Sequence, residues 1–134
     1  ENMLKNLIDK TREFYALIEK YKKPERLYIC IAEDWKRELF IKIKEGKNIG
    51  EIMKDEKFRK YGDTVVKIFN KYHKDKIKIV PTSNEEFEFI NSAKEFLEKE
   101  LNLKVEILNE IPEIKEINDK AKFAMPLEPA VVLM

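Results

Sequence analysis

The sequence contains few of the residues that carry covalent chemistry or hold metals and phosphates. Among its 134 residues there is one cysteine, Cys30, one histidine, His73, and three glycines. A single cysteine excludes an intramolecular disulfide, so we expect a reducing compartment, the cytoplasm. A lone histidine without a nearby cysteine or second histidine argues against a metal site. The glycines, Gly46, Gly50 and Gly62, are not spaced as in a phosphate-binding loop.

Long apolar runs and an excess of one charge are also missing. No stretch approaches the roughly 18 apolar residues that span a bilayer, and no signal-peptide pattern opens the chain, so no membrane partner is expected. Lysine and arginine number 27 against 26 acidic residues. The charges are unevenly distributed, because residues 57–78 carry eight basic and two acidic groups, whereas residues 85–119 carry eleven acidic and four basic groups. This pattern predicts a molecule with one basic and one acidic region.

The apolar run from Leu27 to Ile31 is the centre of the predicted fold. Its five residues show no polar alternation, which is typical of a strand that is covered on both faces and lies in the middle of a sheet. Asp34 can cap the helix that follows, in which Trp35, Leu39 and Ile43 recur at helical spacing. We expect this helix to fold back over the strand.

Residues 3–21 predict an amphipathic helix, which Pro24 ends. Two positions are open for this helix, one under the sheet and one in a neighbouring helical bundle, and the second is favoured. The chain begins with Glu1, and its first residues already have helical periodicity. This indicates a piece of a longer polypeptide.

The rest of the chain predicts further helices and two more strands. A helix from Asp63 has an apolar face and, on another side, a basic face of Lys67, Lys71 and Lys74. Residues 77–80 predict an edge strand or an extended exit. After them we expect a helix that Ser83 or Asn84 caps and that runs to about residue 101, followed by a half-buried strand over residues 103–108. Residues 109–122 predict a charged loop with one helical turn, and residues 129–134 predict a last strand.

These elements predict an α+β fold. A strand that returns after a long helical crossover lies parallel to the first strand, with a right-handed connection. We therefore expect a small three-stranded, mixed sheet covered by several helices and preceded by a separate N-terminal amphipathic helix.

A catalytic centre is not indicated by the residues present. Cys30 lies in the apolar strand, where a thiol behaves as a small apolar side chain, and His73 lies on a lysine-rich helix. A binding surface is the remaining possibility. Lys67, Lys71 and Lys74 could follow a line of phosphates, although lysines on an exposed helix can also serve only solubility.

Two segments resemble a known family. These are LYICIAEDWKRELF, which contains Trp35, and the terminal run AKFAMPLEPAVVLM, residues 121–134. Together they resemble the C-terminal region of archaeal and eukaryotic-type leucyl-tRNA synthetases, over about residues 24–134. In that family a tryptophan-bearing helix follows a strand, and the chain closes near an Ala-Met-Pro-Leu-x-Pro-Ala sequence, which here runs from Ala124 to Ala130.

The resemblance implies that residues 1–23 are a linker helix at the end of an anticodon-binding-type helical bundle and that residues 24–134 are a C-terminal tRNA-binding domain. Such a domain holds tRNA(Leu), particularly its long variable arm and elbow, within the parent synthetase chain. The sequences that handle ATP in class I synthetases are missing from these 134 residues. Leucine-tRNA ligation, with its ATP and magnesium, would therefore belong to the rest of the parent enzyme, and this fragment would be non-catalytic and need no cofactor.

The expected tRNA-binding residues are five lysines and the last two residues of the chain: Lys67, Lys71, Lys74, Lys120, Lys122, Leu133 and Met134. Prolines 126 and 129 would stiffen the approach to the last strand, so that main-chain groups at the chain end could bond to flipped-out bases. No catalytic residue and no metal ligand are expected. Two alternatives stay open: a protein-interaction module that uses the acidic helix over residues 85–100, and a small free-standing enzyme.

Overall fold

The computed structural model describes residues 2–109 and 113–134. In this part of the chain the elements, in order, are α1 (Asn2–Ile18), β1 (Arg26–Cys30), α2 (Asp34–Lys44), α3 (Ile49–Ile52), α4 (Glu56–Arg59), α5 (Asp63–Tyr72), α6 (Ser83–Ser92), α7 (Lys94–Leu101), β2 (Lys104–Leu108), α8 (Lys115–Ala121) and β3 (Ala130–Leu133).

The three strands form a mixed sheet in the order β2-β1-β3, with the apolar strand β1 at its centre. Strand β2 is parallel to β1 and β3 is antiparallel to it. This confirms the predicted fold class. The parallel pairing follows from the long crossover between β1 and β2, whereas β3 reverses direction after the loop and α8 that lie before it.

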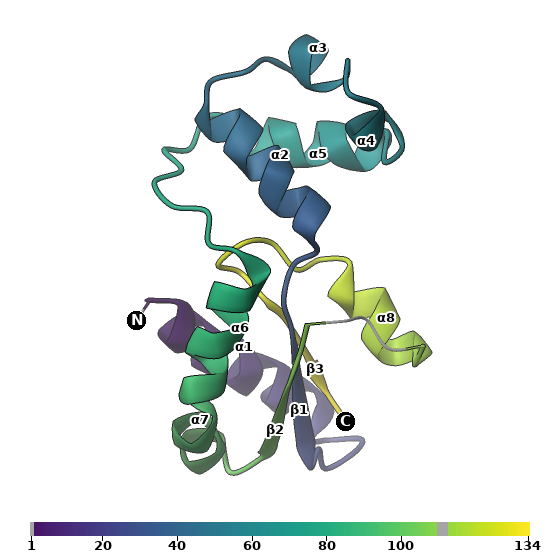
Figure 1. Cartoon of the computed structure of the whole chain (residues 1–134). Coiled ribbons are helices and arrows are strands. Elements are labelled where there is room, and N and C mark those ends of the chain that lie inside the picture. The colour runs from purple at the N-terminus through teal and green to yellow at the C-terminus, as the bar shows by residue number, and fades with distance from the viewer. Residues whose placement is uncertain (1, 110–112) are drawn as a thin grey trace.

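Helices cover both faces of the sheet, as Figure 1 shows. On one face Leu27, Ile29 and Val131 pack with side chains of α1, α6 and α7. On the other face Cys30 and Val132 pack with α8. Because side chains alternate along each strand, neighbouring residues of β1 enter two different cores.

The N-terminal helix α1 packs under the sheet. Leu7 is 2% exposed in the core with β1 and α7, and the buried Thr11 hydroxyl donates to the carbonyl of Leu7. Of the two positions weighed for this helix, the favoured one, apart from the sheet, is therefore wrong for this structure. The helix ends at Ile18, before the predicted end at residue 21, and Tyr21 is 89% exposed. Whether residues 1–23 also belong to a helical bundle of a parent chain stays a prediction.

Helix α2 was expected to fold back over β1, but it does not. It leads away from the sheet into a second group of helices, α2 to α5, which lies at the top of Figure 1 and which we call the helical lobe. There Leu39 and Ile43 pack against Phe58, Val65 and Ile68. The sheet with α1, α6, α7 and α8 is the sheet lobe. The apolar stripe of α2 was read correctly, but its partner is α5 rather than β1.

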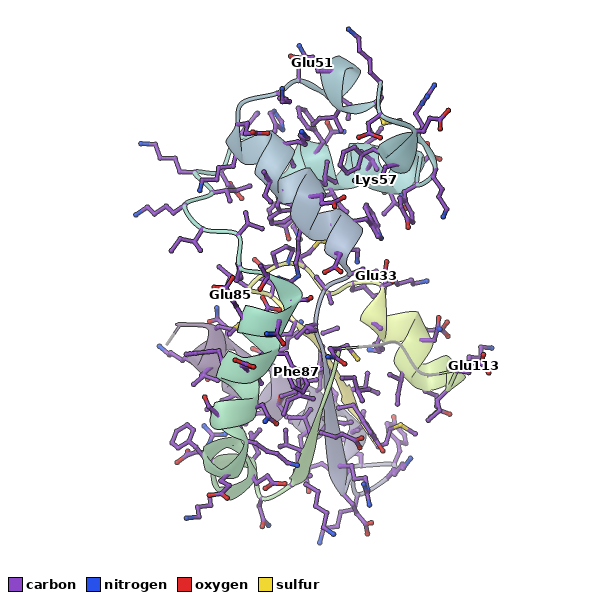
Figure 2. The ribbon with its side chains drawn as sticks, viewed as in Figure 1. Glu33, Glu51, Lys57, Glu85, Phe87 and Glu113 are labelled. Carbon is purple, nitrogen blue, oxygen red and sulfur yellow. The ribbon has the colours of Figure 1, made fainter. Side chains whose placement is uncertain are left out.

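A buried ion pair joins the two lobes. The Nη2 atom of Arg37 in α2 lies 3.1 Å from Oε2 of Glu86 in α6, and their side chains are 5% and 0% exposed. The guanidinium also donates to the carbonyls of Ala32 and Pro81, and Glu86 accepts the main-chain N–H of Leu127. Figure 2 shows the region where the two lobes meet, with Glu33 and Glu85 labelled there. Two charges can be held away from water here because each is paired and hydrogen-bonded.

Several element ends differ from the predictions. Thr82, rather than Ser83 or Asn84, caps α6 and forms a capping box with Glu85. The single helix expected up to residue 101 breaks at Ala93, next to Ser92, whose hydroxyl donates to the carbonyl of Phe89 and so competes for an acceptor of the helix.

The loop regions differ as well. Residues 77–80 form an extended exit and no strand. Within the charged segment 109–122, residues 110–112 lie outside the described residues, and α8 is longer than the single turn expected. Glu33 instead of Asp34 stands at the N-cap of α2, and its carboxylate accepts the indole N–H of Trp35 instead of capping the helix.

Candidate nucleic-acid interface

The predicted basic face of α5 is exposed. Lys67 and Lys71 lie on the outer side of the helix, and Lys74 follows in the turn after its C-terminus. In the part of the chain that the structure describes, none of the three forms a salt bridge. The Lys71 ammonium lies 5.3 Å from the ring centroid of Tyr72. These lysines are available to a partner, but they belong to the helical lobe.

The other predicted residues gather in the sheet lobe, around a groove that runs along β3 between α1 and α8. Two adjoining hollows of about 450 and 490 Å³ form it, and both are lined by Phe14, Lys120 and Val131. Leu133 and Met134 line the first hollow, and Lys122 lines the second. Four of the seven predicted residues are thus brought together, while the three lysines of the helical lobe lie elsewhere.

The groove has basic walls. Its lysines are Lys10 and Lys22 from the N-terminal segment and Lys120 and Lys122 from the α8 region. Against these four cations stand two carboxylates, those of Glu116 and Asp119. The excess of positive charge favours an anionic partner such as a phosphate backbone.

Apolar and aromatic side chains lie between the lysines. Phe123 is 67% exposed, with the Lys122 ammonium 5.5 Å from its ring centroid, and Lys120 lies 5.1 Å from the ring of Phe14. Leu17 is also 67% exposed. An exposed aromatic ring beside a lysine can stack on a nucleobase while the cation contacts a phosphate. The sequence pattern did not single out Phe14 or Phe123, because neither lies on the lysine-bearing helix α5.

Strand β3 contributes unpaired main-chain groups to this groove. In the described chain β3 pairs with β1 alone and is an edge strand. Arg26 and Met134 exchange two N–H···O bonds of 2.9 Å, and such pairs alternate with pairs that make none. The N–H and carbonyl groups of Val131 and Leu133 therefore point away from β1, towards the open side.

This geometry bears on the expected contact through Leu133 and Met134, which stays a prediction. The main-chain N–H and carbonyl of Met134 are occupied by Arg26 and Glu25, so they are not available to bases. The free main-chain groups belong to Leu133 instead. The side chains of Leu133 and Met134 are both half-buried and pack in different cores, one on each face of the sheet. The chain end is thus held in place, as expected, by the sheet itself.

The segment from Ala124 to Pro129 acts as a junction between the lobes. The buried Lys36 ammonium of α2 donates to the carbonyls of Lys122 and Ala124, and burial lowers the pKa of Lys36, an effect that Glu33 opposes. The Tyr72 hydroxyl of α5 donates to Glu128. Prolines 126 and 129 are buried. Residues 124–129 therefore support β3 at the junction of the lobes, and none of them lines the groove.

Sequence reasoning missed several of these residues. Lys10 and Lys22 were not predicted, because residues 1–23 were assigned to a neighbouring helical bundle. The buried ion pair did leave a signal: Arg37 is three residues before Phe40 and Glu86 is four residues before Ile90, so both charges lie in line with an apolar stripe. A charge in such a position indicates a buried polar partner.

Cys30 and His73, the residues that could act as a nucleophile or a metal ligand, lie in environments that favour neither role. Cys30 is buried, and burial raises its pKa to about 11, which keeps the thiol protonated. His73 is exposed and stacked on Phe69. Within residues 2–109 and 113–134 no group of three or more potential metal ligands is found. No helix in the same residues is both long and apolar enough to cross a bilayer.

Comparison with known proteins gives archaeal relatives. The chain is 34% identical to the leucine–tRNA ligase of Methanocaldococcus jannaschii over 148 residues, which covers 99% of this chain and 15% of the relative. It is 37% identical to that of Methanococcus vannielii, covering 82% and 11%, and 35% identical to that of Pyrococcus abyssi, covering 99% and 14%. No family model matches the chain. Its homologues are thus leucine–tRNA ligases, and the chain spans no more than about 15% of their length.

Proposed function

We propose that this chain is the C-terminal region of an archaeal-type leucine–tRNA ligase and that it binds tRNA(Leu) in the groove between α1, β3 and α8. The long variable arm and the elbow of the tRNA are the parts that it holds. The observation that supports this most is the open edge of β3, where main-chain groups of Val131 and Leu133 lie between four lysines. Phosphates contact the lysines, and unpaired bases meet the strand edge.

Lys120 and Lys122 are the principal backbone contacts in this proposal, with Lys10 and Lys22 on the facing wall. Lys67, Lys71 and Lys74 supply a second, separate contact from the helical lobe. The junction at residues 124–129 holds the groove and the lysines of α5 in a fixed orientation relative to each other. The fragment contributes binding, while ligation, ATP and magnesium belong to the rest of the parent chain in the cytoplasm.

The test measures binding of a tRNA(Leu) transcript to the chain by fluorescence anisotropy between about 50 and about 200 mM salt. Each phosphate that a lysine neutralises adds about 0.7–0.9 to the slope of log K against log salt. The double variant Lys120→Ala, Lys122→Ala should therefore lower that slope by about 1.4–1.8. Lys94→Ala with Lys99→Ala, two lysines of α7 away from the groove, is the matched control and should leave the slope unchanged.

Specificity is measured with a second transcript that has a short variable arm. We expect it to bind more weakly than tRNA(Leu), because its arm does not reach the edge of β3. Equal binding of both transcripts would reduce the proposal to general attraction between a basic surface and RNA. If the salt-dependence slopes of the groove variant and the control variant are equal, tRNA does not bind in the groove.

A further inference from the structure

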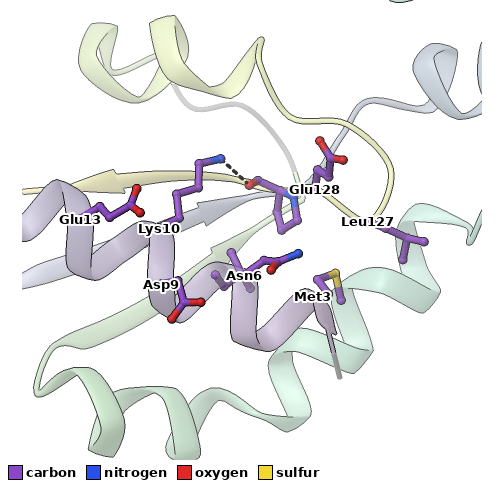
Figure 3. Close-up of a pocket in the computed structure, with 9 residues that line it drawn as sticks. Met3, Asn6, Asp9, Lys10, Glu13, Leu127 and Glu128 are labelled. Carbon is purple, nitrogen blue, oxygen red and sulfur yellow. Dashed lines mark hydrogen bonds between the residues drawn. The ribbon is translucent and has the colours of Figure 1, made fainter. Parts of the chain in front are cut away.

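A second concave surface lies beside the N-terminal half of α1, next to the groove, and Lys10 borders both. It consists of two adjoining hollows of about 310 and 650 Å³ between the start of α1, the start of α6 and the turn before β3. Both hollows are lined by Met3, Asn6, Leu127 and Glu128. Figure 3 shows the first of them, with Lys10 at its border and bonded to the carbonyl of Pro129. We call this surface the acidic cleft.

The floor of the acidic cleft has apolar side chains that face solvent. Phe89 of α6 and Leu127 of the turn are each 43% exposed, and Met3 is half-buried beside them. Leu127 has a φ of 65°, in the left-handed region that a leucine rarely adopts. Exposed apolar side chains gathered in a hollow are typical of a surface that a partner covers.

The rim of the acidic cleft is negatively charged. It carries Asp9 and Glu13 from α1, Glu85 from α6 and Glu128 from the turn, against one cation, Lys10. The capping box with Thr82 lowers the pKa of Glu85, so its carboxylate stays ionised. This charge repels a phosphate backbone and attracts lysine and arginine. The cleft and the groove therefore select partners of opposite charge.

We propose that the acidic cleft docks a basic amphipathic segment of a partner protein. An apolar side chain of the segment lies between Phe89 and Leu127, and its lysines and arginines pair with Asp9, Glu13 and Glu85. This extends the alternative of an interaction through the acidic helix over residues 85–100, but only the first turns of that region take part. The site does not depend on tRNA binding, because Lys22, Lys120 and Lys122 of the groove do not line the cleft, and only Lys10 borders both surfaces.

The test uses a synthetic amphipathic peptide of leucine and lysine and a matched peptide of leucine and glutamate, added to the isotopically labelled chain and followed by amide chemical shifts. The lysine peptide should shift Met3, Phe89 and Leu127, and the glutamate peptide should not. Phe89→Ala should weaken binding by about tenfold, since it removes the central apolar contact. Phe96→Ala, which removes an aromatic ring that is 52% exposed on α7, is the matched control and should leave the affinity unchanged.

Charge is tested with the triple variant Asp9→Asn, Glu13→Gln, Glu85→Gln, in which the glutamine preserves the capping box. We expect at least about fivefold weaker binding, against no change for Glu88→Gln with Glu95→Gln, two exposed carboxylates elsewhere on α6 and α7. Shifts centred outside the cleft, or equal binding by the triple variant and its control, overturn the proposal. So do shifts in the cleft that depend on protein concentration alone, which indicate a second copy. The double variant Lys120→Ala, Lys122→Ala should leave binding of the lysine peptide unchanged. This result distinguishes peptide binding in the cleft from tRNA binding in the groove.

Discussion

Replacing Glu86 by alanine tests whether the buried ion pair holds the two lobes together. The change removes the only carboxylate found beside the Arg37 guanidinium among the described residues, and it removes the acceptor for the main-chain N–H of Leu127. The Nε atom of Arg37 already has no hydrogen-bond partner in the described structure. The variant therefore leaves a buried positive charge that only main-chain carbonyls can satisfy.

Breaking a buried pair by removing one partner costs about 3–5 kcal/mol. The side chains of Arg37 and Glu86 are 5% and 0% exposed, so water does not compensate for the loss. A single domain is stable by only about 5–15 kcal/mol in total. With about 2.1 cal/mol/K of unfolding entropy per residue over 134 residues, a loss of 3 kcal/mol lowers Tm by roughly 10 °C.

The free energy of unfolding is measured by urea titration followed by circular dichroism. Glu38→Ala, which breaks an exposed pair of 2.7 Å with Lys57, is the matched control and should cost little, since solvent screens that pair. Glu86→Gln should lie between the two, because the amide still accepts the Leu127 N–H but carries no charge. If Glu86→Ala costs no more than Glu38→Ala, the ion pair does not stabilise the junction and the reasoning fails.

Three further predictions follow from the edge strand and the buried titratable groups. Leu133→Pro removes an N–H that points to solvent, so it should leave the fold intact and weaken tRNA binding. Val132→Pro removes a hydrogen bond to β1 and should destabilise the sheet. Equal melting curves of the two variants in circular dichroism would contradict the assigned strand geometry. Burial, together with the nearby Glu128 carboxylate, raises the pKa of Tyr72 to about 12. The stability that the protonated Tyr72 hydroxyl contributes is therefore complete below the usual pKa of 10 and is lost as pH rises through 12. Tyr72→Phe should abolish that loss in alkaline unfolding curves. Burial raises the pKa of Cys30 to about 11, so iodoacetamide should label the native protein far more slowly than the urea-unfolded protein, and equal rates would mean an open strand.

The sheet was predictable because its signals are local. The apolar run of β1 has no polar alternation, residues 103–107 alternate between apolar and polar, and the crossover between the two strands is long enough to allow the parallel pairing that is observed. Helix ends are set locally as well: the side chains of Asn48 and Asp55 cap α3 and α4, and Asn102 ends α7 in the left-handed conformation. Each of these features depends on residues close in sequence.

The partners of the helices were not predictable in the same way. The apolar stripe of Leu39 and Ile43 indicates that one face of α2 is buried, but it does not indicate whether that face packs against β1 or α5. The same holds for α1, whose stripe fits a bundle as well as a sheet. Burial of a helix face is non-directional, since the hydrophobic effect depends on area removed from water and not on which element removes it.

The sequence by itself determined the class of fold, the central strand, the exposed lysines of α5 and the resemblance to leucyl-tRNA synthetases. Only the tertiary structure decided that Lys10 and Lys22 face Lys120 and Lys122 across the edge of β3, about a hundred residues away along the chain. It also decided that the terminal motif supports the junction of the two lobes. The reason is physical: local propensity acts through neighbouring residues, whereas a groove is formed by the packing of elements that are distant in sequence.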